Sequence, residues 1–206
     1  MGLSHYVLEP LKLNFMKKNR FGQAKVLDTE ELDTVISNLP SNKHKTLALL
    51  LRNCGCRVGE AVQLTWNDVE EESILFPATI VKRKLKSREI FISQKFFNTL
   101  MKWKEELALI KGRKIVQEDY IFPGRFEGSF LTPRAFQLAL ESALKASSIK
   151  GGSSHSFRRS MLTKLHKSGL ALKIIQSLSG HSSLNTLSLY LEISDSDKKK
   201  AIALLA

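Results

Sequence analysis

The segment KHKTLALLLRNCG, residues 43–55, has apolar side chains spaced as in an α-helix, and this constrains the fold more than any other feature. Leu47, Leu50, Leu51 and Cys54 recur at intervals of three and four, which places them on one face of a helix. The glycine that closes the segment is the residue type that commonly follows a helix. The pattern therefore predicts a buried helix that ends at this glycine.

Other stretches predict further helices around this one. Residues 28–40 begin with Asp28 or Thr29 as a helix cap and end at Pro40, and a short helix starts at Val58. More helices are expected at about 95–111, 132–147, 156–168, 171–178 and 184–192. The tail is capped by Ser194 or Asp195 and carries an apolar pattern of Ala201, Ile202, Leu204 and Leu205.

Residues 72–93 differ from the rest of the chain. They are rich in β-branched residues and have a charged middle between apolar flanks, which predicts short strands joined by a basic turn around Lys84 to Ser87. The expected fold class is therefore mainly α with a small antiparallel β-sheet (α+β). We expect residues 1–26 to form an arm or linker and residues 27–206 to form one domain.

The charge balance favours an anionic partner. Lysine and arginine number 32 against 20 aspartates and glutamates, which gives a net charge of +12. Nucleic acid is the first candidate, because a positive field attracts polyanions and neutralised phosphates release counterions.

No apolar run approaches the roughly 20 residues of a membrane span. Cys54 and Cys56 match none of the common zinc spacings, so we expect two reduced cytosolic thiols.

Five short stretches carry side chains suited to phosphate chemistry: Arg57 and Glu60 in CGCRVGE, Lys84 in the basic turn, His155 and Arg158 in SHSFRRS, His181 in SGHSS, and Tyr190 nine positions after that histidine. Each alone is ordinary. An Arg-x-x-Glu pair is usually a surface pair on a helix, and short motifs often match by chance. Leu184, Leu187 and Leu191 in GHSSLNTLSLY likewise have ordinary core spacing.

In this order, however, the residues resemble the catalytic domain of the tyrosine recombinases, the phage-type integrases. The resemblance runs from about Val26 to the end of the chain, and its most specific pieces are CGCRVGE, HSFRRS and SGHSSLNTLSLY. It implies the fold of that domain and an enzyme that cleaves and rejoins DNA through a 3′-phosphotyrosine on Tyr190. Such enzymes act in DNA recombination and integration, including that of mobile elements, and need no metal, nucleotide or other cofactor.

The resemblance also implies a role for each residue. Arg57 and Arg158 would clamp the scissile phosphate, because a guanidinium is always charged and forks onto two oxygens. His181 would donate a hydrogen bond to the same phosphate, and Tyr190 would attack it from a helix that packs on its leucines. The remaining roles are proton transfer to the departing 5′-oxygen by Lys84, assistance to the tyrosine by His155, and orientation of a neighbour by Glu60.

Several assignments stay open. The general acid is one of Lys82, Lys84 and Lys86, and Lys84 is favoured because it lies nearest the middle of the hairpin. Arg134 and Gln137 are either DNA-reading side chains on one helix or plain surface residues. Arg159 would contact either DNA or the protein.

The N-terminus departs from the family pattern. Most members carry an additional helical domain that closes over the other side of the DNA, and about 26 residues cannot form it. The chain resembles the short members, or a catalytic domain excised from a longer protein.

Expected partners are double-stranded DNA, further copies of the chain in a tetramer on DNA, and accessory DNA-bending proteins, with no membrane. The expected location is cytoplasmic and nucleoid-associated. The terminal segment KKKAIALLA would dock on a neighbouring protomer or pack on its own domain.

Three other functions compete with strand exchange. A topoisomerase-IB-like protein would relax DNA with the same residues, and a non-catalytic relative would only bind DNA. The third alternative is a basic helical domain that binds RNA or a protein. All six catalytic positions hold the expected residue types, which argues against a non-catalytic relative. No aromatic strand or GXXG loop of the RNA-binding kind is present.

Overall fold

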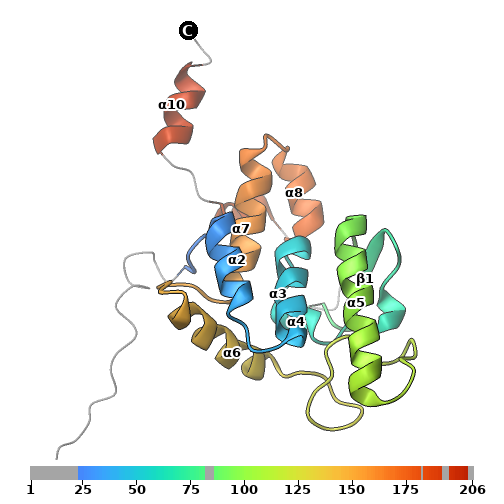
Figure 1. Ribbon diagram of the computed structural model, residues 1–206. Helices are drawn as coiled ribbons and strands as arrows, with labels where there is room; N and C mark the ends of the chain where they lie inside the picture. Colours follow the sequence, from blue (N-terminus) through green and yellow to red (C-terminus); the bar gives the residue numbers. More distant parts are fainter. Residues whose placement is uncertain (1–22, 82–85, 182, 192–194, 204–206) are drawn as a thin grey trace, which may run out of the picture.

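The computed structural model describes residues 23–81, 86–181, 183–191 and 195–203 (Figure 1). The first half contains α2 (Thr29–Ser37), α3 (Asn42–Cys54), α4 (Val58–Ala61), the 3₁₀ helix η1 (Trp66–Asp68), β1 (Ser73–Phe76), β2 (Arg88–Phe91) and α5 (Gln94–Lys111). The second half contains α6 (Pro133–Ala146), α7 (Ser154–Lys167), α8 (Leu172–Ser179), α9 (Leu184–Ser188) and α10 (Asp195–Ala203). The chain is therefore mainly helical with one small sheet, as predicted.

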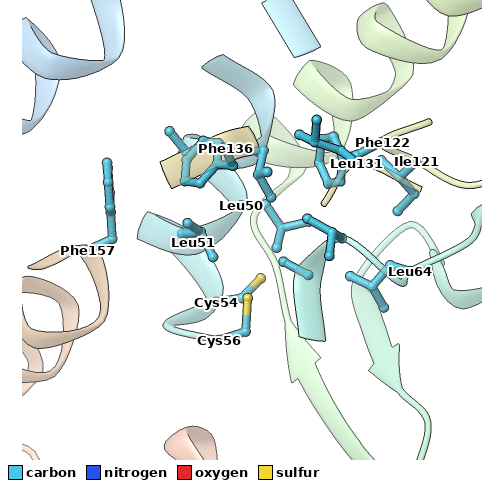
Figure 2. Close-up of a cluster of buried hydrophobic side chains, with 14 of the residues drawn as sticks. Leu50, Leu51, Cys54, Cys56, Leu64, Ile121, Phe122, Leu131, Phe136 and Phe157 are labelled. Atoms are coloured by element: carbon cyan, nitrogen blue, oxygen red, sulfur yellow. The ribbon is translucent and has the colours of Figure 1, made fainter. Parts of the chain in front are cut away.

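Helix α3 lies in the middle of the main core, with α2 on one side and α5 on the other (Figure 1). Its predicted apolar face is confirmed, because Leu47, Leu50, Leu51 and Cys54 are all buried. Figure 2 shows Leu50 and Leu51 between aromatic side chains that include Phe136 of α6 and Phe157 of α7. Because α7 packs on α3, the predicted arginine and histidine of α7 are fixed relative to the end of α3.

The local signals read from the sequence account for the helix ends in this core. Asp28 caps α2 by accepting a hydrogen bond from the backbone N–H of Glu31 at 2.8 Å. Gly55 ends α3 in the left-handed conformation, with φ +56°. The Gly55 carbonyl faces the second half of the chain, where it accepts a hydrogen bond from Arg158 of α7. Cys54 and Cys56 are buried and not joined in a disulfide.

The two strands form an antiparallel hairpin, in which Ser73 pairs with Phe91 and Phe76 pairs with Arg88. The inner face carries the buried side chains of Ile74, Phe76 and Ile90. Arg88 is also buried, at the first position of β2. Residues 82–85 of the predicted basic turn lie outside the described residues.

The last predicted helix is shorter than expected. A helix over about 184–192 was predicted, but α9 ends at Ser188 and Tyr190 lies in the following turn. The backbone N–H groups of Tyr190 and Leu191 donate to the carbonyls of Leu187 and Ser188, so three-residue spacing replaces the α-helical ladder there. Of the predicted leucine row, Leu187 is fully buried, Leu191 is partly buried and Leu184 is 43% exposed.

Helix α10 stands apart from the other helices in Figure 1. Ile202, one member of the predicted apolar pattern, is 69% exposed. Leu204 and Leu205 lie outside the described residues, as does Ser194. Among the helices that the structure describes, none combines the length and the apolar composition that crossing a membrane requires.

Candidate active site

Arg57 lies just beyond the α3 turn, where it caps the start of α4. Its guanidinium Nη1 donates to Glu60 Oε1 at 2.8 Å, and its backbone N–H donates to Glu60 Oε2 at 3.2 Å. Glu60 is buried, whereas Arg57 is partly exposed. The predicted Arg-x-x-Glu pair is therefore not a surface pair: the buried carboxylate holds the arginine at the edge of a cavity.

That cavity has a volume of about 360 Å³ and brings together three predicted residues from two distant parts of the sequence. Arg57 and Glu60 line one part of it, and His155 from the first turn of α7 lines another. Ile80, from the segment after β1, also contributes. His155 is exposed there, so its imidazole is accessible to a molecule that enters the cavity.

Arg158 lies one helical turn after His155 but points into the protein, with only 1% of its surface exposed. Nη1 donates to the Gly55 carbonyl at 2.5 Å, and Nη2 donates to the Ser179 carbonyl at 2.8 Å. These two carbonyls end α3 and α8, so Arg158 ties both helix ends together. A cation is favourable at such ends, because the last carbonyls of a helix carry partial negative charge.

His181 follows α8 and contacts the same arginine. Arg158 Nη2 lies 3.2 Å from His181 Nε2, and Ser179 Oγ lies 2.7 Å from His181 Nδ1. Nη2 also lies 3.5 Å from Nδ1. Because a guanidinium can only donate, we assign the nearer nitrogen, Nε2, as the acceptor, which assigns the proton to Nδ1 and makes Nδ1 the donor to Ser179 Oγ. Gln176 holds the backbone of the same turn by donating to the His181 carbonyl at 3.0 Å.

Tyr190 completes this group. Its ring lies 4.7 Å from the His181 ring, measured between centroids, with an interplanar angle of 52°. The guanidinium carbon of Arg158 lies 5.5 Å from the centroid of the tyrosine ring, within cation–π range. The predicted tyrosine, histidine and arginine are therefore in mutual contact, although the tyrosine lies after α9 and not within it.

Burial, together with the concentration of positive charge, shifts the pKa of two members. Burial, followed by the positive charges of Arg158, Arg57 and Arg88, lowers the pKa of His181 to about 4. Burial, Arg57 and Arg88 lower the pKa of Arg158 to about 10. At neutral pH, His181 is therefore neutral and Arg158 still carries its charge.

Glu60 is the acidic member of this cluster. Burial alone would raise the pKa of its carboxyl, but the hydrogen bonds and charges of Arg57 and Arg88 outweigh burial and lower it. The carboxylate therefore stays ionised at neutral pH. It balances part of the positive charge of the arginines around it.

Arg88 belongs to this site and was missed by the sequence analysis. It donates to Glu60 at 3.1 Å through Nη2 and to the Ser179 carbonyl at 2.9 Å through Nη1. The signal available in the sequence was weak, because an arginine at the start of a strand is usually on a solvated edge. Only the register of the hairpin, which pairs it with buried Phe76, shows that it faces inward.

The other predicted residues lie as follows. Lys82 and Lys84 fall outside the described residues, and Lys86 is exposed just before β2. Arg134 and Gln137 are exposed on α6, where Arg134 Nη1 lies 3.9 Å from Glu141 Oε1. Arg159 is 7% exposed and its guanidinium donates to the Ala24 carbonyl. Of the two alternatives for Arg159, DNA or the protein, this contact supports the protein.

The predicted residues therefore lie in two groups that Arg88 connects: Arg57, Glu60 and His155 line the cavity, and Arg158, His181 and Tyr190 are in mutual contact. Comparison with known proteins shows the family of the chain. The Phage integrase family profile matches residues 25–197, so the chain belongs to the phage integrase family. Several relatives and solved structures are similar to it.

Transposase A from transposon Tn554 of Staphylococcus aureus is 26% identical over 206 residues, which cover 94% of this chain and 55% of the transposase. The crystal structure of XerA recombinase superposes with a TM-score of 0.72 at 21% identity, covering 87% of this chain and 64% of XerA. XerH site-specific recombinase, in a post-cleavage complex with palindromic difH substrate, gives a TM-score of 0.71 at 25% identity over 87% of this chain and 52% of XerH. The chain spans about half the length of the relatives it matches in sequence.

Proposed function

We propose that this chain is the catalytic domain of a site-specific DNA recombinase or integrase, which cleaves and rejoins DNA strands through a 3′-phosphotyrosine on Tyr190. The observation that carries the proposal is the contact of Tyr190 with both His181 and Arg158, at a centre where Arg57 and Arg88 add further positive charge. A phenol against a cationic, water-poor cluster is suited to attack on an anionic phosphodiester. The structures of the Tn1549 transposon integrase in complex with circular intermediate DNA support DNA as the partner, and we propose that this DNA is double-stranded.

In the proposed reaction, the phenolic oxygen of Tyr190 forms a bond to phosphorus and the bond from phosphorus to the 5′-oxygen breaks. The phenolic proton leaves through His155, and the 5′-oxygen takes a proton from a lysine of the β1–β2 turn, for which Lys84 remains the proposed residue. The rejoining step reverses both proton transfers. Because a phenol with a pKa near 10 leaves more readily than an alkoxide, the covalent link keeps the bond energy for rejoining.

The arginines stabilise the negative charge that builds on the non-bridging oxygens during this attack. Preorganised donors of this kind are usually the largest catalytic contribution. Arg57 faces the cavity and can meet a phosphate directly, with Glu60 fixing its orientation. Arg158 is buried beneath the Tyr190 ring, so its contact with the phosphate requires the ring to move aside as DNA binds.

The arrangement of His181 is consistent with this entry of DNA. Its Nε2 accepts a hydrogen bond from Arg158 in the DNA-free structure. A phosphate that takes over the guanidinium would free Nε2, and the neutral ring can then shift its proton to that nitrogen and donate to the phosphate. Self-association into a tetramer on DNA, docking of α10 on a neighbouring protomer and accessory DNA-bending proteins remain parts of the proposal, as does the arm at residues 1–26.

A covalent-trapping experiment tests the proposal. The protein is mixed with a library of nicked, labelled duplexes in which the cleaved end cannot religate, and the adduct is resolved on a denaturing gel. We expect an adduct with the wild-type protein and none with Tyr190→Phe, whose duplex binding stays nearly unchanged. Tyr120→Phe is the matched control, because it removes a phenol from outside the site. An equal adduct from Tyr190→Phe would contradict the assignment.

The trapped DNA also separates strand exchange from the topoisomerase-like alternative. Sequencing it gives the target, and a narrow set of sequences supports recombination. Relaxation of any supercoiled plasmid without pairing of two sites would favour the topoisomerase-like activity. Duplex binding with no adduct from any duplex would favour a non-catalytic DNA-binding protein.

A further inference from the structure

Arg88 bridges the two parts of the chain that build the site. It starts β2, is nine-tenths covered and stacks its guanidinium over the Phe76 ring, 5.0 Å from the ring centroid. Nη2 donates to Glu60 Oε2 at 3.1 Å, and Nη1 donates to the Ser179 carbonyl at 2.9 Å. One guanidinium therefore connects α4 with the C-terminal end of α8.

Each partner of Arg88 holds a proposed catalytic residue. Glu60 uses its other carboxylate oxygen to hold the guanidinium of Arg57 at 2.8 Å. The Ser179 carbonyl also accepts from Arg158 at 2.8 Å, and the Ser179 hydroxyl lies 2.7 Å from the His181 ring. A shift of Arg88 would therefore reach both sides of the site, although Arg88 does not line the cavity.

The chain after Ser179 is fitted closely around this arginine. Gly180 adopts φ +66°, and a Cβ atom at that position would lie 2.5 Å from Arg88 Nη1 and 3.2 Å from Arg88 Cδ. Only a residue without a side chain permits this approach and this backbone conformation together. The turn that carries His181 is thus built against the side chain of Arg88.

We propose that Arg88 is a positioning residue, which fixes Arg57 through the Glu60 carboxylate and fixes Arg158 and His181 through the Ser179 carbonyl. The proposal rests on the function proposed above, because the residues it positions are those of the DNA cleavage reaction. Arg88 does not touch the phosphate in this scheme. Its effect is on the rate of cleavage and not on DNA affinity.

The test compares Arg88→Gln with Arg113→Gln. Arg113 also donates two hydrogen bonds to a carboxylate, that of Asp119, but it lies in the loop after α5. Cleavage is measured in a single turnover at saturating protein on the duplex found by trapping, and DNA affinity is measured separately. We expect Arg88→Gln to slow cleavage about tenfold or more, because small misplacements of reacting groups cost rates of that order. Arg113→Gln should cleave at the wild-type rate.

Two further measurements remove the ambiguity of a folding defect. Arg88→Lys keeps the charge but cannot reach both partners at once, so it should retain the melting temperature better than Arg88→Gln and still cleave slowly. In a double-mutant cycle, Glu60→Gln and Arg88→Gln should be non-additive in rate, because they interrupt the same link. Rate effects that simply multiply would overturn the link through Glu60.

A readout without DNA separates this proposal from the proposed function. In the DNA-free protein, NMR titration of the His181 imidazole should give a higher pKa in Arg88→Gln than in the wild type, because one neighbouring positive charge is gone. If the wild-type protein forms no adduct, the proposed function is rejected. The titration of His181 then still tests whether Arg88 acts on the turn that carries His181. An unchanged His181 titration, or wild-type cleavage by folded Arg88→Gln, would reject the role of Arg88.

Discussion

The two regions that supply the proposed catalytic residues differ in how they are packed. Arg57 and Glu60 stand on the main core, where α3 is surrounded by α2, α5, α6 and the first turn of α7. Tyr190, which contacts His181, packs against a second cluster whose fully buried members, among the described residues, are Leu162, Ile175 and Leu187. Helix α7 takes part in both, because Phe157 packs in the main core and Leu162 in the small one.

This difference indicates that the first region is rigid and the second is the more mobile of the two. Arg57, the proposed phosphate-binding arginine at the start of α4, stands on a large apolar core, whereas Tyr190 rests on little buried surface. Regions with few buried apolar contacts open locally at low free energy, and moving elements are drawn from them. The buried polar links of Arg158 and Arg88 to the Gly55 and Ser179 carbonyls and to Glu60 then hold the second region against the first.

The largest effect is expected from cutting the link at Arg158. Arg158→Ala removes a proposed phosphate donor and leaves the Gly55 and Ser179 carbonyls without this partner. Cleavage should fall by roughly 3 kcal/mol or more of transition-state stabilisation, as for the loss of other oxyanion donors. Single-turnover trapping gives the rate. Near wild-type cleavage by Arg158→Ala would show that Arg158 does not belong to the phosphate clamp. Arg158→Lys measures how much of the cleavage rate is retained when the positive charge is kept without the planar guanidinium.

A truncation in each core measures the packing difference directly. Leu51→Ala in α3 should lower the free energy of unfolding by about 2–5 kcal/mol, because it opens a cavity in a fully buried region. Leu187→Ala in α9 should lower it less, because the second cluster can open without unfolding the main core. Urea denaturation followed by far-ultraviolet circular dichroism gives both values.

Hydrogen exchange completes this comparison. Leu187→Ala should speed exchange of the amides of α8 and α9 while those of α3 stay protected, and it should reduce adduct formation because Tyr190 packs against the same cluster. Equal losses of global stability in the two variants would show that the regions unfold as one unit.

The pH dependence of stability should carry a contribution from the second region. The pKa of His181 is lowered to about 4 in the folded protein, whereas an unfolded histidine titrates near 6.5. The unfolded chain therefore binds more protons between these values, and this contribution is complete above about pH 6.5 and is lost as the pH falls toward 4. Urea midpoints measured across this range should fall less steeply in His181→Gln. Identical slopes in both proteins would contradict the shift.

Local signals predicted the first region better than the second. Asp28 and Gly55 act within a few residues of their own helices, so the ends of α2 and α3 could be read from the sequence. The end of α9 could not be predicted in this way, because the leucine spacing continues past Ser188 while the helix ends there. The bond between Arg88 and Glu60 spans 28 positions and depends on the strand register, which no local pattern shows. Candidate catalytic residues could be proposed where a motif keeps them together in the sequence, and Arg88 was missed because it belongs to no such motif.

The smallest effect on stability is expected away from both buried clusters, at Arg134 on the exposed face of α6. Its pair with Glu141 is long, at 3.9 Å, and both side chains are more than half exposed. Such pairs contribute about 0–1 kcal/mol, so Arg134→Ala should leave the urea midpoint almost unchanged. If α6 contacts DNA, which is one of the two alternatives left open for Arg134, the variant should bind duplex more weakly and its affinity should depend less on salt, by roughly one unit of slope. An unchanged affinity and salt dependence would assign Arg134 to the plain surface of α6 and would leave the cavity lined by Arg57 and His155 as the proposed DNA-facing part of the described chain.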